Sequence, residues 1–356
     1  MSTPSTEPGS PGPVLPDPVS AFAAAQFSRA TGAGLDPHVY LRATGGAASP
    51  GAWGEALVRT AREYADRARE AAASGSAVSA GAYEQAAARW FHFATLAPRT
   101  SAADSAHHAH AAAEADAAMG RALALLEPGA RRIQGPSFTG WLRGPADASS
   151  TVIVVPGLDS GKEEFHRVTA ALLRRGSAVF ALDGPGQGAL AATTTLRADY
   201  DQVIGQAVDA LGLDRVGLIG LSLGGYYVAR SAALDPRVAA AAVVSGPYLL
   251  DWEGLPPALR ELIAQRAGGP GAAREFTAEV DLSVLAPRIR CPLLVVDGGR
   301  DLVPGVTNGS ELARRAPRGA YLLVPEGDHL LGNAQPDWLP ATADWLTKAL
   351  AAAPAA

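Results

Sequence analysis

Apolar and polar residues alternate along this chain with two different periods, and the change falls near Arg131. Between residues 52 and 127 the sequence is rich in Ala, and apolar positions recur every three to four residues. That spacing places them on one face of an α-helix, with almost no strand signal. The predicted helices span residues 53–73 and 82–97, and a third runs from a cap at Ser101 or Asp104 to Leu126.

After Arg131, short apolar runs that end in Gly or Pro alternate with segments long enough for helices. The runs are TVIVVPG, GSAVFALDG, RVGLIGLS, VAAAAVVSG, CPLLVVDGG and GAYLLVPEG. Such alternation predicts a mostly parallel sheet with helices on both faces. Residues 133–144, which precede the first run, are expected to form an antiparallel strand pair. In open sheets of this kind the reactive loops follow the carboxyl ends of the strands.

The two patterns divide the 356 residues into three parts. Residues 1–20 contain six prolines and lack the basic and apolar regions of a signal peptide, so we expect a disordered leader. Residues 21–130 are expected to form an all-helical domain, and residues 131–356 an α/β domain.

Composition and charge exclude several classes of partner. The net charge is −5 and the basic residues are scattered among acidic ones, so nucleic acid is not expected to bind. No run approaches the roughly 18 apolar residues of a membrane helix, so no membrane partner is expected. The single cysteine, Cys291, cannot form an internal disulfide, which suits the cytoplasm. We expect a soluble cytoplasmic protein whose partner is a small molecule, and a homodimer is compatible with the sequence.

The stretch LIGLSLGG, residues 218–225, places Ser222 between Gly220 and Gly224. In a chain this rich in Gly and Ser the G-x-S-x-G pattern arises easily by chance, so its context decides. A strand, RVGLIG, precedes the serine and a helical segment, YYVARSAAL, follows it. This order predicts a nucleophile elbow, a sharp turn from strand to helix that exposes a serine hydroxyl. A turn serine without chemistry is the alternative.

A serine hydroxyl needs a base within hydrogen-bond distance and a carboxylate that orients the base. The segment CPLLVVDGGRDLVP offers Asp297 and Asp301, and we prefer Asp301 because it lies further beyond the predicted strand. Asp297 is expected to shape that turn. His329 follows the next strand, in GDHLLGN. The order of the three residues along the chain, and the position of each just after a predicted strand, predict a triad of Ser222, Asp301 and His329. The alternatives are that Asp301 caps a helix and that His329 is an ordinary surface-loop residue.

Two backbone N–H groups are expected to hold the negative charge that develops on the substrate oxygen. Leu223 follows the nucleophile, and Leu158 follows Gly157 at the end of an earlier strand. The adjacent Asp159 would place a carboxyl near the reacting carbonyl. It could donate a proton or orient the substrate if its pKa is raised. The alternative for Asp159 is a cap for a helix that begins near Lys162.

No cofactor or metal is expected. The segment ALDGPGQG, residues 181–188, lacks the order of a dinucleotide-binding loop and is expected to be a turn that organises the site. His107, His108 and His110 lie close in sequence, but no acidic residue or Cys with ligand spacing accompanies them. They are expected to face solvent or to pack against a neighbouring helix.

Several of these motifs together resemble one branch of the α/β-hydrolase superfamily. The motifs are GLDSGKEEF, DGPGQG, GLSLGGYY, GGRDLVP and GDH, preceded by the helical segment AYEQAAARWFHFA. The branch contains 2,6-dihydroxypseudooxynicotine hydrolase and hydrolases of polyketide and pigment pathways, and the similarity covers residues 22–350. It implies the α/β-hydrolase fold with an N-terminal helical lid and an active site between the two parts.

The resemblance also implies Ser222 as nucleophile, Asp301 as acid and His329 as base. The nicotine-pathway enzyme has a Glu, thought to assist catalysis, where this chain has Asp159. Members of the branch cleave carbon–carbon bonds beside a ketone, hydrolyse esters, or eliminate small acids such as acetate from cyclic intermediates. The resemblance therefore implies a serine hydrolase, with a lyase of the same fold as the alternative.

Aromatic residues are candidates to line a pocket for a bulky substrate. They are Trp90, Phe91 and Phe93 in the second predicted helix, and Tyr226, Tyr248 and Trp252 in the α/β domain. The alternative is that these rings only hold the lid against the core.

Overall fold

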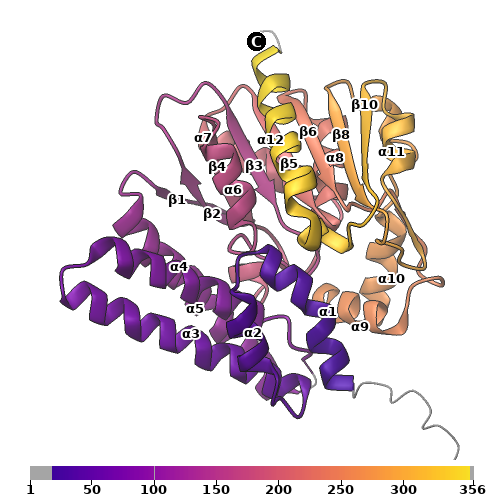
Figure 1. The fold of residues 1–356 in the computed structure, drawn as a ribbon. Coiled ribbons are helices and arrows are strands. Elements are labelled where there is room, and N and C mark those ends of the chain that lie inside the picture. Colours follow the sequence, from indigo (N-terminus) through magenta and orange to yellow (C-terminus); the bar gives the residue numbers. More distant parts are fainter. Residues whose placement is uncertain (1–17, 100, 353–356) are drawn as a thin grey trace, which may run out of the picture.

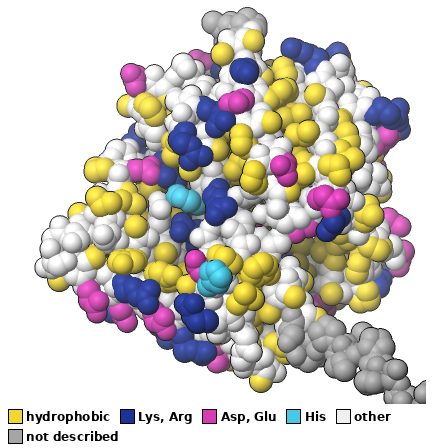
Figure 2. All heavy atoms as spheres, in the orientation of Figure 1, with side chains coloured by type: hydrophobic (Ala, Val, Ile, Leu, Met, Phe, Trp, Pro, Cys, Tyr) yellow, Lys and Arg dark blue, Asp and Glu magenta, His cyan; other side chains and the backbone are white. Residues whose placement is uncertain are grey.

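The computed structural model describes residues 18–99 and 101–352. Its elements form two regions, one above the other in Figure 1: a helical region, residues 18–126, and a sheet region that begins at Arg131. On the face shown in Figure 2 both regions carry acidic and basic side chains, and Lys and Arg gather near the junction. The change of period near Arg131 in the sequence therefore coincides with the change from helices to sheet.

Five helices make up the helical region of the described chain. They are α1 (Pro18–Gly32), α2 (Pro37–Thr44), α3 (Pro50–Ala73), α4 (Ala77–Ala94) and α5 (Ala102–Leu126). The three predicted helices are confirmed as α3, α4 and α5, although α4 begins and ends earlier than expected. At the start of α5, Ser101 accepts a hydrogen bond from the Asp104 N–H, as a cap should. The sequence pattern does not predict α1 or α2.

The predicted leader, residues 1–20, falls largely outside the described residues. Only its last three residues are described, and these are helical because α1 begins at Pro18. The leader as predicted is therefore too long. A proline is tolerated at the first position of a helix because its missing N–H would have no partner there.

The helices α3, α4 and α5 pack around a core of their own. Trp53, Leu57, Trp90, Phe93 and Leu123 are almost completely buried there. Burial of each such side chain is worth about 1.5–3 kcal/mol relative to exposure. This core explains why the Ala-rich segments keep their larger apolar residues on one face.

Within the described residues, eight strands form one sheet in the order β1-β2-β4-β3-β5-β6-β8-β10. The strands are β1 (Arg131–Gly135), β2 (Phe138–Arg143), β3 (Thr151–Val155), β4 (Ala178–Asp183), β5 (Val216–Leu221), β6 (Val238–Val244), β8 (Leu293–Gly298) and β10 (Gly319–Val324). β2 pairs antiparallel with β1 and β4, and the other neighbours are parallel. The expected antiparallel pair and the mostly parallel sheet are both confirmed.

Helices cover both faces of this sheet (Figure 1). On one face lie α6 (His166–Leu173) and α12 (Gln335–Ala352), whose apolar residues pack against Val152 and Val154 of β3. On the other face lie α7 (Asp201–Leu211), α8 (Leu223–Leu234) and α11 (Ser310–Arg315), packed against Ile153 and Val155. Alternate residues of one strand therefore serve two cores, which is why the strands read as continuous apolar runs.

The remaining elements are short. They are β7 (Leu249–Leu250), which pairs antiparallel with β9 (Val306–Thr307), the helices α9 (Pro257–Ala267) and α10 (Pro270–Glu279), and the 3-10 turns η1 (Gly188–Leu190), η2 (Ala286–Arg288) and η3 (His329–Ala334). Two of them, α9 and α10, lie below the sheet in Figure 1. None of the helices in the described chain is long and apolar enough to cross a membrane.

Buried ion pairs join the helical region to the sheet region. Lys162, on the loop between β3 and α6, places its Nζ 2.7 Å from Asp183 of β4, 2.8 Å from Glu163 and 2.9 Å from Asp116 of α5. The charges of these carboxylates raise the pKa of Lys162 although burial alone would lower it. One ammonium group thus holds three separate segments together.

Candidate active site

Ser222 lies at a sharp turn between β5 and α8. Its backbone has φ 55° and ψ −128°, a conformation that is strained for a residue with a side chain. A Cβ at Gly220 would lie 2.0 Å from the Gly224 carbonyl oxygen, and one at Gly224 would lie 2.3 Å from the Val155 oxygen. Both flanking glycines are therefore required by the close packing of the turn. Strand, turn and helix follow one another as the motif predicts.

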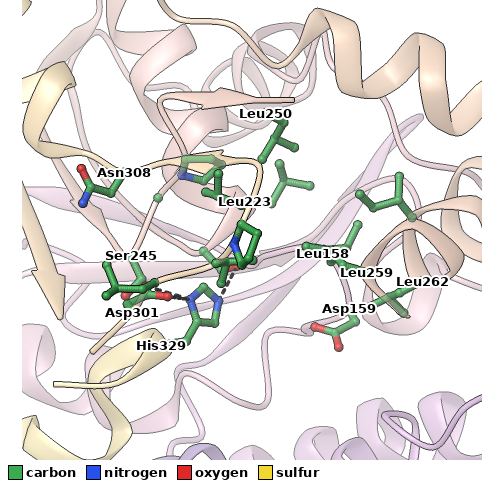
Figure 3. Close-up of a pocket in the computed structure, with 18 of the residues that line it drawn as sticks. Leu158, Asp159, Leu223, Ser245, Leu250, Leu259, Leu262, Asp301, Asn308 and His329 are labelled. Atoms are coloured by element: carbon green, nitrogen blue, oxygen red, sulfur yellow. Dashed lines mark hydrogen bonds and ion pairs between the residues drawn. The ribbon is translucent and has the colours of Figure 1, made fainter. Parts of the chain in front are cut away.

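The imidazole of His329 lies beside Asp301 in Figure 3, and its other nitrogen contacts Ser222. Its Nε2 is 3.0 Å from Ser222 Oγ, and its Nδ1 is 2.9 Å and 3.0 Å from the two carboxylate oxygens of Asp301. Asp301 follows β8 and His329 follows β10, so loops after three strands bring the three side chains together. The Asp301 side chain is 12% exposed and that of His329 is 47% exposed. The structure brings Asp301, rather than Asp297, to the histidine.

The loop that carries His329 is fixed by contacts that the sequence motifs do not reveal. Leu330 and Leu331 have φ of 65° and 51°, which is unusual for non-glycine residues. The Leu330 N–H donates to Ser245 Oγ at 3.0 Å, and Trp338 Nε1 donates to the Leu331 oxygen at 3.2 Å. Ser245 follows β6, and its place at a strand end is the only signal in the sequence that could have singled it out.

Leu158 and Leu223, the expected oxyanion residues, both line the cavity at Ser222. A Cβ at Gly157 would lie 2.9 Å from Ser222 Cβ, so the loop after β3 lies directly against the serine. Neither the Leu158 nor the Leu223 N–H donates a hydrogen bond to another group of the described chain. Two unpaired donors beside a serine hydroxyl can serve an oxygen of a bound molecule.

The loop at residues 181–188 supports this arrangement through Gln187. The Gln187 Nε2 donates to the carbonyl oxygens of Pro156 and Gly157, at 2.7 Å and 2.8 Å. Its Oε1 accepts from the hydroxyl of Tyr200 at 2.5 Å and from the Gly184 N–H at 3.1 Å. The loop is a turn beside the site, as expected, and the Gln187 side chain connects it to the loop of Pro156 and Gly157.

The cavity in front of Ser222 has a volume of about 530 Å³ and mostly apolar walls. These walls are mostly aliphatic, with one aromatic ring from Phe276 of α10. Several of the aliphatic side chains are visible in Figure 3: Leu158, Leu223, Leu250, Leu259 and Leu262. Polar groups enter it from Arg29, Asp159, Asp297 and Asn308. Such a cavity suits a largely apolar small molecule with a few polar atoms.

None of the three candidate aromatic residues on α4 lines this cavity. Trp90 stacks on Tyr64 of α3, with ring centroids 6.4 Å apart, and Phe91 and Phe93 are at most 2% exposed in the core of the helical region. The expectation that they bind substrate is wrong for this structure. Helical spacing shows that these rings share a buried surface, but not which neighbour covers it.

The three aromatic candidates of the sheet region do not line the cavity either. Tyr226 is fully buried in α8, and its hydroxyl donates to the Glu279 oxygen at 2.9 Å. Tyr248 is 5% exposed, and Trp252 lies under the guanidinium of Arg274. Their rings pack inside the protein, and the cavity wall is formed instead by aliphatic residues of β7 and α9 and by Phe276 of α10, which the sequence pattern does not single out.

Asp159 lines the cavity, but it is ionised and it does not cap a helix. Burial would raise its pKa, yet the charge and hydrogen bonds of Arg29 outweigh burial and lower the pKa below its ordinary value. Arg29 Nη2 and Nη1 lie 2.9 Å and 3.2 Å from its two oxygens. The next helix, α6, begins only at His166. The raised pKa that a proton donor would need and the helix cap are therefore both corrected, because neither allowed for a cation from α1. An ionised Asp159 at the cavity can still orient a polar group.

Arg29 connects α1 to the loop beside the nucleophile. Besides Asp159, it contacts both oxygens of Glu164, at 2.6 Å and 2.9 Å, and Ser160 Oγ at 3.0 Å. Glu164 also accepts from His92 of α4 at 2.9 Å if the ring carries its proton there. These partners lower the pKa of Glu164 although burial alone would raise it. The apolar pattern of the sequence does not point to Arg29, because it does not predict α1.

Close backbone contact also joins α1 to the loop of His329. A Cβ at Gly32, the last residue of α1, would lie 2.6 Å from Gly332 Cα in η3. A Cβ at Gly332 would lie 2.5 Å from the carbonyl oxygen of Ser28. Gln335 Nε2 donates to the Gly32 oxygen at 2.6 Å. Two glycines thus let the first helix pack directly on the loop of the base.

Asp297 lies at the end of β8 and lines the same cavity, buried to 2% exposure. Burial raises its pKa to about 6 and the charge of Asp301 adds to the increase, although Tyr321 and the N–H groups of Gly309 and Ser310 oppose it. Its Oδ2 is buried without a hydrogen-bond partner in the described chain. The expected role of Asp297 in shaping the turn fits its place beside Gly309, where a Cβ would lie 3.3 Å from its oxygens.

The three neighbouring histidines of α5 do not form a cluster of ligands. His108 is buried against Arg266, with 3.0 Å between His108 Nε2 and Arg266 Nη2, and burial lowers its pKa to about 3. His107 and His110 are exposed. No group of three potential metal ligands is present in the part of the chain that the structure describes.

Comparison with known sequences agrees with this geometry. A family model described as serine aminopeptidase, S33, matches residues 146–271. The chain is 31% identical over 251 residues to 2,6-dihydropseudooxynicotine hydrolase of Paenarthrobacter nicotinovorans, covering 65% of this chain and 68% of that protein. It is also 40% identical over 109 residues to 20-hydroxy-prefusarin hydrolase of Gibberella moniliformis, covering 27% of this chain and 26% of that one.

Comparison with solved structures extends the likeness to the helical region. The crystal structure of the 2,6-dihydroxy-pseudo-oxynicotine hydrolase matches with a TM-score of 0.79 and 26% identity, over 92% of this chain and 98% of that one. A second structure, AbyA5, has a TM-score of 0.63 at 17% identity over 83% of this chain and 89% of its own, and supports the fold alone. With its sheet, its elbow serine and these relatives, the chain belongs to the α/β-hydrolase family that includes 2,6-dihydropseudooxynicotine hydrolase.

Proposed function

We propose that this enzyme is a cofactor-independent serine hydrolase that attacks a carbonyl group of a small, largely apolar substrate. The observation that carries the proposal is the continuous hydrogen-bonded chain from Ser222 Oγ through His329 to Asp301 at the wall of the cavity. A hydroxyl in this arrangement can lose its proton as it attacks.

In the first step Ser222 Oγ bonds to the carbonyl carbon while His329 Nε2 takes the hydroxyl proton. Asp301 accepts the Nδ1–H of the ring, which fixes the tautomer that leaves Nε2 able to accept, and stabilises the imidazolium. The N–H groups of Leu158 and Leu223 hold the oxygen that becomes negative, assisted by the positive end of the α8 dipole.

In the second step His329 returns its proton to the leaving group, and the acyl group stays on Ser222. If the leaving atom is carbon, the electron pair of the broken bond must be held as an enolate, which the proton then quenches. Water, activated by His329, next attacks the acyl group and frees the acid and the serine. No metal or cofactor takes part in any of these steps.

The substrate proposed is a ketone or ester from secondary metabolism. Support comes from the mostly apolar walls of the cavity and from the relatives, whose names describe hydrolases of a pseudooxynicotine and of a prefusarin. Arg29 and Asp159 form a fixed charged pair at the same wall, suited to orienting a polar end of such a molecule. We also propose that the enzyme works in the cytoplasm, on a small molecule alone.

Labelling with a fluorophosphonate probe tests the nucleophile. The intact enzyme should be labelled, and Ser222→Ala should lose the label, because the probe bonds only to an activated serine. Ser160→Ala is the matched control, since this serine lies on the neighbouring loop at Asp159 and should leave labelling intact. Loss of label in Ser160→Ala with retention in Ser222→Ala would refute the assignment.

Turnover in oxygen-18 water separates hydrolysis from elimination of an acyloxy group. Hydrolysis places the heavy oxygen in the acid product, because water attacks the acyl group. Direct elimination leaves the released acid unlabelled. If the released acid is unlabelled and turnover still requires Ser222, the enzyme is a lyase of the same fold and the proposed hydrolase activity is refuted.

A further inference from the structure

A second cleft opens where the helical region meets α6 and α12. Its volume is about 650 Å³, and it shares no lining residue with the cavity at Ser222. Its polar lining comes from several elements: Arg89 of α4, His166 and Arg167 of α6, Arg174 and Arg175 after α6, and Gln335 of α12. No Asp or Glu is among the lining residues, all of which are described. Figure 2 faces this junction, where Lys and Arg side chains gather.

Arg89 is the most unusual residue of the cleft. Its Nε and Nη1 are buried, and the guanidinium makes no hydrogen bond or ion pair with any group of the described chain. Burial and the charge of Arg167 lower the pKa of Arg89 to about 10, so the group is still charged at neutral pH. A buried charge without a partner is costly, and proteins keep one mainly where a ligand or a counter-ion completes it.

Two further donors lie beside Arg89. A Cβ at Gly34 would lie 3.5 Å from Arg167 Nε and 3.7 Å from Arg89 Nε, so both guanidinium groups flank the same glycine. His166 Nδ1 is also buried without a partner. Burial and the surrounding arginines lower the pKa of His166 to about 3, so its ring is neutral. A neutral ring can still donate one N–H to an acceptor.

We propose that this cleft binds a phosphate group, either inorganic phosphate or a phosphate monoester. Arg89, Arg167 and His166 can all donate toward the cleft, and the acceptor of Gln335, its Oε1, is already taken by Arg167 Nη1 at 3.0 Å. Such a set matches a tetrahedral dianion whose oxygens all accept. A bound phosphate would contact α4 and α6 together, and would therefore tie the helical region to the sheet region. Arg175 already pairs with Asp344, at 2.5 Å, so the ligand would supply the negative charge that Arg89 lacks.

Thermal unfolding of the full chain in increasing inorganic phosphate, at constant ionic strength, tests the site. The melting temperature should rise and saturate, by about 3 °C at a phosphate concentration far above Kd. In Arg89→Met the melting temperature without phosphate should be equal to or above that of the parent, because an unpaired buried charge is removed, and the rise should disappear. Isothermal titration should give heat for the parent and none for Arg89→Met.

Arg42→Gln is the matched control, since it removes one charge from an exposed position of α2 and should keep the whole rise in melting temperature.

Glycerol phosphate and malonate are tested as further ligands, the first as a phosphate monoester and the second as a dianion without phosphate. A rise with glycerol phosphate assigns ester-linked phosphate, and a rise with inorganic phosphate alone assigns the free ion. An absent or unsaturable rise in the parent, a rise that survives in Arg89→Met, or binding of malonate in place of phosphate would overturn the proposal. Hydrolase activity enters none of these measurements.

Discussion

Two carboxylates, Asp297 and Asp301, lie side by side at the end of β8, and their surroundings give them different tasks. Asp301 contacts His329, whereas Asp297 is buried and carries an oxygen without a partner. Sequence alone separates the two by position beyond the strand, and the geometry agrees with that choice. The protonation of Asp297, in contrast, depends on burial and on the charge of Asp301, which a sequence pattern does not describe.

Replacement of Asp297 by Asn should stabilise the protein at neutral pH. Folding raises the pKa of Asp297 to about 6, so the fold favours the protonated form. The contribution of protonated Asp297 to the free energy of unfolding is complete below about pH 4 and is lost as the pH rises through about 6. Asn cannot ionise, so Asp297→Asn should raise the free energy of unfolding by about 2–3 kcal/mol at neutral pH. Urea unfolding at neutral pH and at about pH 4 measures this, and an equal gain at both pH values would contradict it.

The same distinction explains which site residues the sequence could predict. Ser222, Asp301 and His329 each follow a recognisable strand, so local pattern and chain order were enough to select them. Asp159 was misjudged because its partner, Arg29, lies 130 positions away in the chain. The aromatic candidates failed for a related reason, since a helical period marks a buried face without naming what covers it.

Among the elements, α1 is the one whose absence from the predicted fold had the greatest effect. Its sequence, PVSAFAAAQFSRATG, has small residues on several sides and no clear apolar stripe. The longer helices α3 and α5 begin at the N-cap residues Ser49 and Ser101, and such a residue before a helical pattern is a recognisable start signal. The strands were predicted well because each is a continuous apolar run closed by Gly or Pro.

Removal of the Arg29 side chain should loosen α1. Asp159 and Glu164 have lowered pKa values in the folded state, so their contribution exists above the unfolded pKa and is lost as the pH falls through the folded one. Arg29→Met leaves both carboxylates buried without their cation and should cost about 3–5 kcal/mol at neutral pH. The deficit should shrink toward about pH 4, where the uncompensated carboxylates take up protons.

Urea unfolding at both pH values, with Arg42→Met as the exposed control, measures this effect of Arg29. The control should change the free energy of unfolding by no more than about 0.5 kcal/mol. A deficit in Arg29→Met that stays constant with pH would show that packing, and not charge, accounts for the loss.

At the scale of the whole molecule, the two regions are held together by charge as well as by apolar contact. Lys162 links α5, the loop after β3 and the end of β4 through three carboxylates. The spacing of apolar residues does not predict such a network, because its members are single residues in three separate segments. The order of the elements is nevertheless visible in the pattern: helices occupy residues 18–126 and the first strand begins at Arg131, where the apolar period changes.

Lys162→Met should strongly destabilise the protein. It would leave Asp116, Glu163 and Asp183 buried with too little positive charge, at a cost of about 3–5 kcal/mol. The matched control is Lys348→Met, the other lysine of the chain, which is exposed on α12 and should change stability by less than about 0.5 kcal/mol. Guanidinium unfolding followed by circular dichroism compares the two, and an equally small effect at both lysines would contradict the role given to Lys162.

The contact between Gly32 and Gly332 has a mechanical consequence. No side chain separates the two backbones there, so there is nothing to compress or rotate when one of them moves. A methyl group at either position would meet the backbone of the other segment, so it would push α1 and the loop of His329 apart. The Arg29 ion pairs hold α1 on the opposite side, to the loop after β3, so the strain of such a substitution would fall on the histidine loop rather than be relieved by displacement of α1.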